Sequence, residues 1–308
     1  MENTRDTVRS TLNRVIEFVL PLLDQHLQHQ QSGSGKSTLA SALYDEFRQR
    51  SPSLQVAFVS LDGFYLKKDD LDSLSRASPG NKLVSVRGPP GTHDVHHAAQ
   101  TLKTLAEGPS HSGRTSVTIP IYDKGAFKGR GDRLPPSEWR VIQTPVNVVI
   151  FEGWCLGFRH LPQDKLEKAI SDAIRQDQSD KSQRRKSGSA ILLEHSPEHL
   201  CQMNEALRSY TQGTGVTAFT DAVDWDAFIQ LDTIDLQNVY RWRWEQEARM
   251  RAATGKGMTE EEVKEFIDKY MPSYYLYIPG LREGVVSKDR QLRLILGRDR
   301  TVTEIQVI

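Results

Sequence analysis

The chain has 308 residues, of which 37% are hydrophobic and 26% are charged, and its 40 basic and 40 acidic residues cancel to a formal net charge of zero. This balance disfavours a strongly basic nucleic-acid binder and an acidic tail protein. The two cysteines, Cys155 and Cys201, form no CxxC pair, so a disulfide scaffold and a cysteine zinc site are both disfavoured. A reducing compartment is therefore expected.

The N-terminal part carries no pattern of a membrane span or a secretory signal. The longest early apolar run, at 15–23, is interrupted by Glu17 and Pro21, whereas a span needs roughly 20 apolar residues. We expect a cytoplasmic protein without a membrane or nucleic-acid partner, and the sequence does not indicate its oligomeric state. A basic run at 181–186 would allow a nuclear location if it served as a targeting patch, but a solvated loop is the preferred interpretation.

In chain order, the first elements alternate between helix and strand. Apolar residues spaced three and four apart predict a helix over 9–28, kinked at Pro21, and a second helix that begins after Lys36. The second helix would place Leu39, Leu43 and Phe47 on one face. The apolar run at 54–61 is typical of a strand buried on both faces.

The middle of the chain alternates loops and strands. Residues 73–91 are rich in glycine, proline and serine and predict a loop, after which Thr92 or Asp94 can cap a helix. The run at 146–151 is the clearest buried strand. Residues 172–189 are almost wholly polar, so we expect a disordered insertion there. The other elements predicted here are strands at 115–121 and 227–231 and a loop at 125–136.

The C-terminal part predicts two helices and two strands. A charged helix over 238–253 ends at Gly255, and Thr259 with Glu262 forms the capping box of a second helix, which Pro272 ends. The strands are predicted at 291–296 and 302–308. Strands that alternate with helices indicate a single α/β domain with a mainly parallel sheet.

The most informative segment is GSGKST, from Gly33 to Thr38. It has the G-K-[ST] end of a Walker A loop, in which backbone N–H groups surround phosphate oxygens, a lysine reaches the outer phosphates and a hydroxyl binds Mg²⁺. The helix predicted after it would point its positive end at the nucleotide. The predicted nucleotide-binding residues are Gly33, Ser34, Gly35, Lys36, Ser37 and Thr38, with Ser37 as the metal ligand.

The segment before this loop departs from the motif. The full motif needs a glycine where the chain has Gln30, and a buried strand that leads into the loop. Residues 24–31 are DQHLQHQQ, and such side chains would lose water in a sheet without gaining partners. The first strand is therefore missing from this sequence. Either a short segment has been lost, through an exon or gene-model error or a splice variant, which we favour, or the chain supports its loop in another way.

Five further segments, taken together with this loop, resemble the glycerate 3-kinase family of P-loop kinases, especially its fungal members, which are related to phosphoribulokinase, uridine kinase and bacterial pantothenate kinase. The segments are LDGFYL at 61–66, RGPPGTHD at 87–94, IYDK at 121–124 with FKGRGDR at 127–133, EGWCLGF at 152–158, and GKGMT at 255–259 with YMPSY at 270–274. The chain departs from the family in the lost strand, in the polar insertion and at Gly63, where the family usually has a second acid.

The resemblance implies a P-loop NTPase fold over 1–308, with an N-terminal helical segment at 1–31 and a helical, lid-like region at 238–272. It also implies that ATP and Mg²⁺ are used to phosphorylate a small hydroxyl compound, with D-glycerate, giving 3-phosphoglycerate, as the best candidate. One alternative is another small-molecule kinase, such as a nucleoside or pantothenate-like one. Another, from a different class, is a nucleotide-binding regulator or a catalytically impaired variant, which the altered start of the loop keeps open.

The residues expected to carry phosphoryl transfer are Lys36 and two acids at strand ends. Asp62 follows a strand, where α/β sheets bind their ligands, and would accept the substrate proton or orient Mg²⁺ through water, unless it only caps the loop. Glu152 resembles a Walker B acid and would bind Mg²⁺ through water. By likeness to lid arginines of related kinases, Arg243 would stabilise transition-state charge, although it could instead be solvated beside packed tryptophans.

An anionic substrate needs a cation, and Arg87, beside a glycine-proline loop, is the first candidate to bind a carboxylate. Arg133 and Lys124 are the next candidates, although all three could be ordinary surface residues. His93 and Asp94 would contact the substrate or cap the following helix. A transition-metal site on the histidines here is disfavoured, because two of them are adjacent on a helix and point apart. The predicted substrate-binding residues are Asp62, Tyr65, Arg87, His93, Asp94, Tyr122, Lys124 and Arg133, of which the two tyrosines could instead pack in the core.

Overall fold

The computed structural model describes residues 34–107, 116–180, 188–211, 225–255 and 257–308. The helix predicted over 9–28, Gly33 of the GSGKST segment and the basic run at 181–186 lie outside these ranges. Among the helices that are described, none combines the length and the hydropathy that a bilayer span requires.

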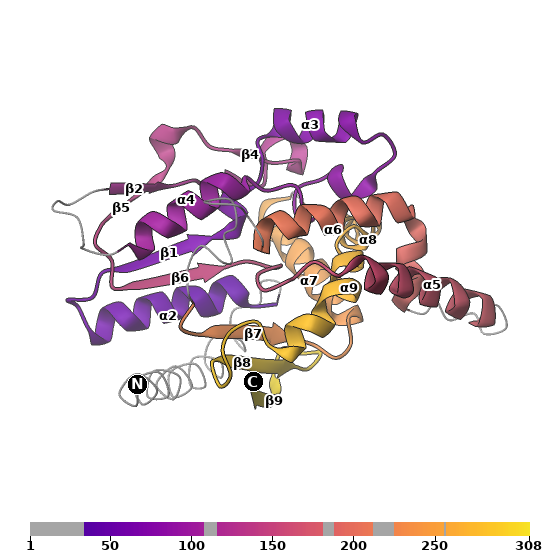
Figure 1. Ribbon diagram of the computed structural model, residues 1–308. Coiled ribbons are helices and arrows are strands. Elements are labelled where there is room, and N and C mark those ends of the chain that lie inside the picture. Colours follow the sequence, from indigo (N-terminus) through magenta and orange to yellow (C-terminus); the bar gives the residue numbers. More distant parts are fainter. Residues whose placement is uncertain (1–33, 108–115, 181–187, 212–224, 256) are drawn as a thin grey trace.

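The first parallel strand pair lies beside the helix of the phosphate loop. β1 (Val56–Ser60) runs parallel to β6 (Val148–Glu152), with Ser60 opposite Glu152. The helix α2 (Lys36–Arg50) contacts both strands and buries Leu39 and Leu43, as its spacing predicts (Figure 1). Because parallel strands place their carboxyl ends at one edge of a sheet, the residues that follow β1 and β6 meet near the start of α2.

A second group of strands forms its own sheet. β7 (Phe228–Asp232) runs parallel to β8 (Gln291–Leu296), and β8 runs antiparallel to β9 (Val302–Val307). Both C-terminal strands are confirmed, including the turn that joins them. Figure 1 shows the core strands in the order β1, β6, β7, β8, but within the described ranges β6 and β7 are not paired with each other.

The chain between β1 and β6 forms one side of the molecule. It contains the helices α3 (Lys68–Ala77) and α4 (Val95–Ala106), and antiparallel ladders of short strands follow α4. The ladders pair β2 (Ser116–Ile119) with β5 (Arg140–Gln143) and β3 (Tyr122–Asp123) with β4 (Asp132–Arg133). α4 is confirmed, and Asp94 rather than Thr92 caps it by accepting the N–H of His97.

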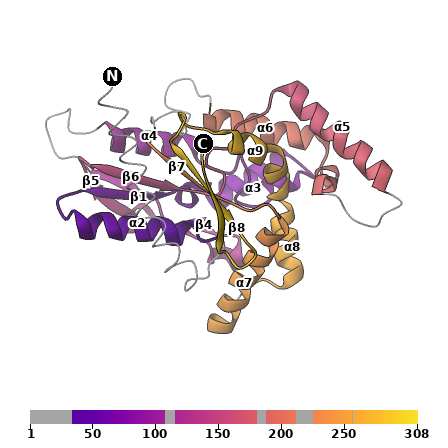
Figure 2. The same ribbon diagram turned by 90° about the horizontal axis from the view of Figure 1, so that it is seen from below.

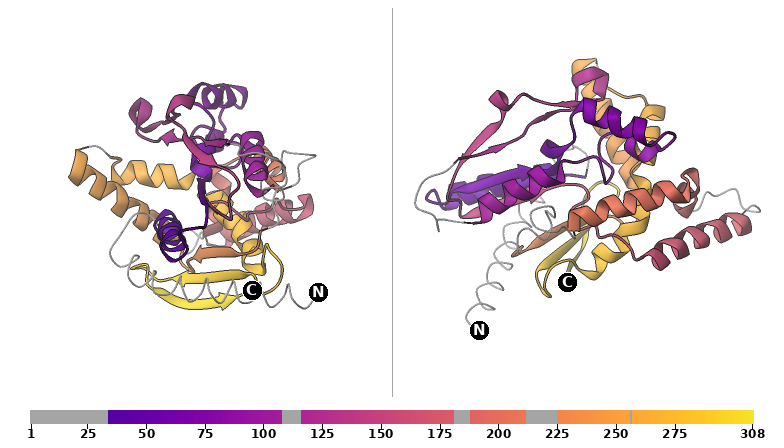
Figure 3. Two further views of the ribbon diagram at one scale, coloured as in Figure 1. Left: turned by 90° about the vertical axis from the view of Figure 1, so that its left-hand side faces the viewer. Right: turned by 45° about the horizontal axis from the view of Figure 1, so that its top comes forward.

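Five helices make up the other side of the molecule. They are α5 (Gln163–Asp180), α6 (Pro197–Thr211), α7 (Gln237–Thr254), α8 (Glu260–Asp268) and α9 (Met271–Glu283). α7 and α8 lie side by side and project from the body (Figures 2 and 3). Gly255 ends α7 with a left-handed φ of 70°, and the capping box of Thr259 and Glu262 is present.

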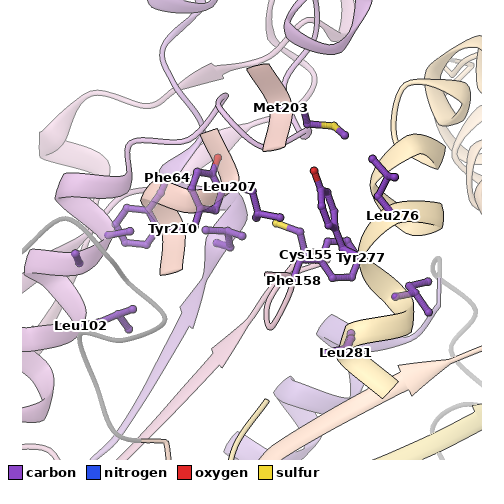
Figure 4. Close-up of a cluster of buried hydrophobic side chains, with 14 of the residues drawn as sticks. Phe64, Leu102, Cys155, Phe158, Met203, Leu207, Tyr210, Leu276, Tyr277 and Leu281 are labelled. Carbon is purple, nitrogen blue, oxygen red and sulfur yellow. The ribbon is translucent and has the colours of Figure 1, made fainter. Parts of the chain in front are cut away.

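The largest hydrophobic core joins the two sides. Apolar side chains from the turn after β1, from α4, from the segment after β6 and from α6 and α9 meet in it. Figure 4 shows Phe64, Leu102, Phe158, Leu207 and Tyr277 converging from these elements. The core therefore fixes the turn that contains Asp62 against helices far away in the sequence.

The prediction of a disordered insertion is wrong for its first part. The polar stretch 172–180 continues α5 instead of being disordered, because Leu166 and Ala173 on one face of this helix are 0% and 1% exposed in the core. Asp172 pairs with Lys168 and Arg175 at helical spacing on the solvent side. The rest of the predicted insertion lies outside the described ranges up to residue 187, and Gly188–Glu194 is a 3-10 helix.

Two helix boundaries also differ from the prediction. Residues 73–77, predicted as loop, are the last turns of α3, where Leu71 is buried. Pro272 was predicted to end the helix before it. Instead α8 ends at Asp268, and Pro272 lies in the first turn of the next helix, α9. A proline fits this position because its missing N–H has no partner in the first turn of a helix.

Candidate active site

The phosphate loop reaches α2 through a left-handed glycine. Gly35 has φ 85° and precedes Lys36, the first residue of the helix. The Lys36 ammonium donates to Ser34 Oγ over 2.8 Å. Desolvation lowers the pKa of Lys36, and the nearby carboxylates of Glu152 and Asp62 oppose this effect. The lysine and both strand-end acids are therefore close enough to act on one another.

Glu152 lies between two hydroxyls. It accepts a hydrogen bond from Ser60 Oγ at 2.6 Å and one from Ser37 Oγ at 3.2 Å. A serine hydroxyl of the phosphate loop and a carboxylate are oxygen donors of the kind that Mg²⁺ prefers. Within the described ranges, no group of three or more histidine, cysteine or acidic side chains is arranged to hold a metal ion.

Asp62 is held as a carboxylate in the turn after β1. It is ion-paired with Lys124 and accepts a hydrogen bond from the Tyr65 hydroxyl at 2.7 Å. Burial by itself would raise the pKa of Asp62, but Lys124 and Tyr65 outweigh it, and the pKa lies below its ordinary value. A charged carboxylate at this place can accept a proton from an alcohol.

Gly63 is explained by the packing of the same turn. A Cβ atom at this position would lie 2.4 Å from the backbone oxygen of Pro120. Such a contact is far shorter than any van der Waals distance, so no side chain fits without a backbone shift. A second acid is therefore excluded here by the approach of the chain at 120.

His93 presents one nitrogen without a partner. The Tyr210 hydroxyl accepts the N–H of Gly91 at 2.8 Å and is hydrogen-bonded to His93 Nδ1 at 2.7 Å. Burial lowers the pKa of His93 to about 3, so the ring is neutral. The buried Nε2 has no partner among the described residues. It is available to a ligand, as donor or as acceptor according to the tautomer of the ring.

Arg87 is used to hold a loop. Its Nη1 donates to the carbonyl oxygens of Gly129 and Arg130, both at 2.7 Å, and the guanidinium lies over the Tyr122 ring at 5.7 Å. The side chain is buried, and the Tyr270 hydroxyl donates to its backbone oxygen. Arg87 was predicted to bind a substrate carboxylate, but its Nη1 nitrogen is bound to backbone oxygens of the protein.

Two tyrosines line the space beside Asp62. The rings of Tyr65 and Tyr122 lie 5.2 Å apart in an edge-on arrangement, and Tyr65 stacks near His93 at 4.8 Å. The Tyr122 hydroxyl is buried and has no partner among the described residues. Burial raises the pKa of this hydroxyl to about 12, so it stays protonated and can donate.

Asp94 and Arg133 have structural partners. Asp94 caps α4 and pairs with Arg133 at 3.2 Å, and Arg133 also donates to the backbone oxygen of Tyr65 at 2.8 Å. The capping alternative for Asp94 is therefore the observed one. Arg133 is almost fully buried and its charge is balanced, so it supports the turn that carries Tyr65.

Arg243 lies in α7, away from these contacts. Its Nη2 donates to Glu247 at 2.5 Å, and its guanidinium lies over the Phe266 ring at 5.0 Å. Both partners belong to α7 and α8, the helices that project from the body. The structure thus gives Arg243 no contact with Lys36 or Asp62 among the interactions of the described residues, and its lid role stays a prediction.

Sequence reasoning missed three residues of the site. Ser60 joins Glu152 to the backbone N–H of Asp62, which it accepts at 3.3 Å. Tyr210 is hydrogen-bonded to His93 Nδ1. Trp154 donates to the backbone oxygen of Gly88 at 3.1 Å. Of these three residues, only Trp154 belongs to one of the segments that resemble the kinase family, EGWCLGF at 152–158. The sequence therefore gave an indication for Trp154 but not for Ser60 or Tyr210.

The chain is similar to known kinases over most of its length. A D-glycerate 3-kinase from Cryptococcus neoformans var. grubii has a solved structure that matches 97% of this chain with a TM-score of 0.78 and 34% identity, and the match covers 99% of that chain. The yeast protein "Probable ATP-dependent kinase TDA10", from Saccharomyces cerevisiae, is 34% identical over 247 residues, which are 80% of this chain and 74% of that protein. The chain belongs to the glycerate 3-kinase family of P-loop kinases.

A plant relative agrees with this membership. The chloroplastic D-glycerate 3-kinase of Arabidopsis thaliana is 32% identical over 260 residues, which are 83% of this chain and 48% of the plant protein. No protein-family model matches the chain. As a member of the glycerate 3-kinase family, the protein is an ATP-dependent small-molecule kinase with an α/β P-loop fold.

Proposed function

We propose that this kinase transfers the γ-phosphoryl group of ATP to the 3-hydroxyl of D-glycerate and forms 3-phosphoglycerate. The observation that carries the proposal is the meeting of Lys36, Asp62 and Glu152 at the carboxyl ends of β1 and β6. Beside them, His93 Nε2 and the Tyr122 hydroxyl are buried and have no partner among the described residues. Two relatives named D-glycerate 3-kinase support the choice of acceptor.

The nucleotide end of the site would bind the phosphates. Lys36 and the backbone N–H groups at the start of α2, from Ser34 to Thr38, would hold the β- and γ-phosphates, with Gly33 as a further predicted ligand. Ser37 and Glu152 would hold Mg²⁺, which when bound neutralises charge on the phosphate oxygens. Their oxygens, 3.2 Å apart, can turn from each other to a shared cation.

The acceptor end would deprotonate and orient the alcohol. Asp62 accepts the hydroxyl proton while the alcohol oxygen forms a bond to the γ-phosphorus and the bond to the bridging β–γ oxygen breaks, so that ADP leaves. Lys124, which is half-exposed beside Asp62, and the Nε2–H of His93 are the donors that we assign to the acceptor carboxylate. Arg87 shapes this pocket through the loop at 129–130.

The test is an acceptor screen that follows ADP release and identifies the product by ³¹P NMR. D-glycerate, L-glycerate, glycerol, pantothenate and uridine are compared on the chain as it stands and on a version with an apolar strand inserted before Gly33. We expect turnover with D-glycerate and a 3-phosphate product. Turnover restricted to another acceptor would replace the substrate, and MgATP binding without turnover on any acceptor in either version would favour a nucleotide-binding regulator.

A further inference from the structure

Residues 87–92, which we call the acceptor loop, are irregular backbone inside the molecule. Residues 87–90 are all buried and belong to no helix or strand, and Thr92 is 0% exposed. The loop leads directly into His93, which we assign to the acceptor. Buried backbone N–H and C=O groups need partners, because an unpaired one costs free energy comparable to a lost hydrogen bond. The shape of the acceptor loop therefore depends on the groups that satisfy its backbone.

Two side chains satisfy the middle and the end of the acceptor loop. Thr92 Oγ1 accepts the N–H of Gly88 at 2.8 Å and donates to the carbonyl oxygen of Pro89 at 2.8 Å. The Tyr210 hydroxyl accepts the N–H of Gly91 at 2.8 Å. The carbonyl oxygens at the start of the loop are left for other partners.

Tyr270 and Trp154 supply these partners from distant parts of the chain. The Tyr270 hydroxyl donates to the carbonyl oxygen of Arg87 at 2.8 Å, and Trp154 Nε1 donates to that of Gly88 at 3.1 Å. The two rings meet edge-on with centroids 4.8 Å apart. Gly88 has φ 123°, and a Cβ atom there would lie 1.8 Å from the Tyr270 hydroxyl oxygen. The tyrosine therefore lies directly on the backbone of the acceptor loop.

The hydroxyl of Tyr270 stays protonated and lies near the charged groups of the site. Burial raises the pKa of this hydroxyl, so it remains a donor at neutral pH. Arg87 lowers the same pKa and Asp62 raises it, so the hydroxyl is within electrostatic reach of both. Tyr270 is thus fixed to the acceptor loop beside the turn that carries Asp62.

Tyr270 also belongs to the α7–α8 hairpin, which projects from the body of the molecule (Figures 2 and 3). It lies between the end of α8 and the start of α9, and its ring packs on Phe266 of α8 with centroids 4.9 Å apart. The guanidinium of Arg243 in α7 lies over Phe266 at 5.0 Å. Trp154 and Tyr210 lie outside these two helices. The hairpin is therefore joined to the acceptor loop through Tyr270.

We propose that Tyr270 is a positioning residue of this kinase, which holds the acceptor loop and His93 in the shape that receives the acceptor and links that shape to the α7–α8 hairpin. Its hydroxyl acts through the loop backbone and not on the reacting atoms. The proposal rests on the acceptor site proposed above, but not on D-glycerate being the acceptor. Loss of the hydroxyl weakens acceptor binding and leaves the nucleotide end intact.

The experiment replaces Tyr270→Phe, which keeps the ring and its packing but removes the donor. The matched control is Tyr277→Phe in α9, because the Tyr277 hydroxyl is buried without a partner in the described ranges. Amide hydrogen exchange of residues 87–93 is measured on the full chain without any substrate. The KM values for MgATP and for the best acceptor of the screen are measured in whichever version of the chain shows turnover. Because exchange needs no acceptor, failure of D-glycerate as a substrate and failure of this proposal are separate results.

We expect Tyr270→Phe to raise the acceptor KM by about 3–10-fold, the effect of one lost hydrogen bond, and to change kcat and the KM for MgATP by less than about twofold. The amides of Gly91 and Thr92 should exchange at least about tenfold faster, because the loop opens more often. Phe266→Leu, which removes the aromatic support of Tyr270, should cause smaller changes in the same direction. Tyr277→Phe should cause none of them.

Unchanged exchange of the acceptor loop in Tyr270→Phe would overturn the proposal. An equal rise of the KM for MgATP and for the acceptor would also overturn it, since a general loosening of the fold affects both substrates. The same changes in Tyr277→Phe would lead to the same conclusion. If Phe266→Leu leaves both the exchange and the acceptor KM unchanged, the link to the α7–α8 hairpin is wrong.

Discussion

The two ends of the proposed site are built differently. The phosphate end consists of Lys36, Ser37 and Glu152, and the acceptor end consists of Asp62, Tyr65 and His93. At the phosphate end Ser37 is exposed and Lys36 is half-buried, and their side chains contact Glu152 and Ser34. At the acceptor end Tyr65 and His93 are 4% and 5% exposed and are hydrogen-bonded to neighbours. The acceptor end is thus preorganised by the protein, whereas the phosphate end needs a charged ligand to complete its contacts. Variants of the two ends should therefore fail in different ways.

The largest effect is expected for Asp62→Asn, made in whichever version of the chain, with or without an apolar strand inserted before Gly33, shows kinase turnover. An amide cannot accept the proton of the acceptor hydroxyl, so kcat should fall by about 10²–10⁴-fold while MgATP binding is retained. Steady-state kinetics and calorimetry measure the two quantities, with Asp164→Asn on the exposed face of α5 as the control. Near-normal kcat would remove the general-base role and leave Asp62 as a structural residue.

The next effect is expected for Lys36→Ala, which changes the phosphate end. Loss of its charge should lower kcat by about 10²–10³-fold and also weaken MgATP binding, because Lys36 faces the phosphates in both the ground and transition states. The Tm should not fall, since burial of this ammonium is itself unfavourable. Lys165→Ala, an exposed lysine in α5, is the matched control. Unchanged MgATP affinity in Lys36→Ala would contradict the assignment.

A smaller effect is expected for Tyr210→Phe at the acceptor end. The change leaves Gly91 and His93 without their shared partner and should cost about 1–3 kcal/mol of unfolding free energy. It should raise the KM for the acceptor but not for MgATP, because the His93 ring loses the hydrogen bond at Nδ1 that holds it in place. Tyr277→Phe is the control, since the Tyr277 hydroxyl is buried without a partner in the described ranges. If both variants behave alike, Tyr210 does not position His93.

The smallest effect is a shift of the pH profile. Lys124 and Tyr65 hold the pKa of Asp62 below its ordinary value against the opposing effect of burial. The carboxylate is therefore kept down to low pH, and activity is lost as the pH falls through this depressed pKa. In Lys124→Met burial prevails, so the acidic limb of kcat/KM against pH should move to higher pH. An unmoved limb would show that Lys124 does not control Asp62.

The positions of the strand-end acids could be predicted because the signals are local. An apolar run followed by Asp62, or ended by Glu152, identifies a strand and its carboxyl end within a few residues. Helix α4 and the capping box at Thr259 are equally local, since a cap and its helix are adjacent in the sequence.

The contacts that shape the acceptor end could not be predicted in this way. His93 and Tyr210 are 117 residues apart, and no sequence pattern near either residue indicates that they form a hydrogen bond. Arg87 looked free beside its glycine-proline loop, yet the carbonyls that occupy it come from residues 129–130. The half-burial of β6 likewise depends on which strand lies next to it, which its own composition does not determine.

The tight approach of Pro120 to Gly63 also constrains how this active site can change over generations. A carboxylate cannot be acquired at 63 in one substitution, since its Cβ would meet a backbone oxygen at 2.4 Å. The segment around 119–121 would have to retreat first, and only then would an acidic replacement be tolerated. In this protein, the step from one acid to two in this turn would thus need an ordered pair of mutations.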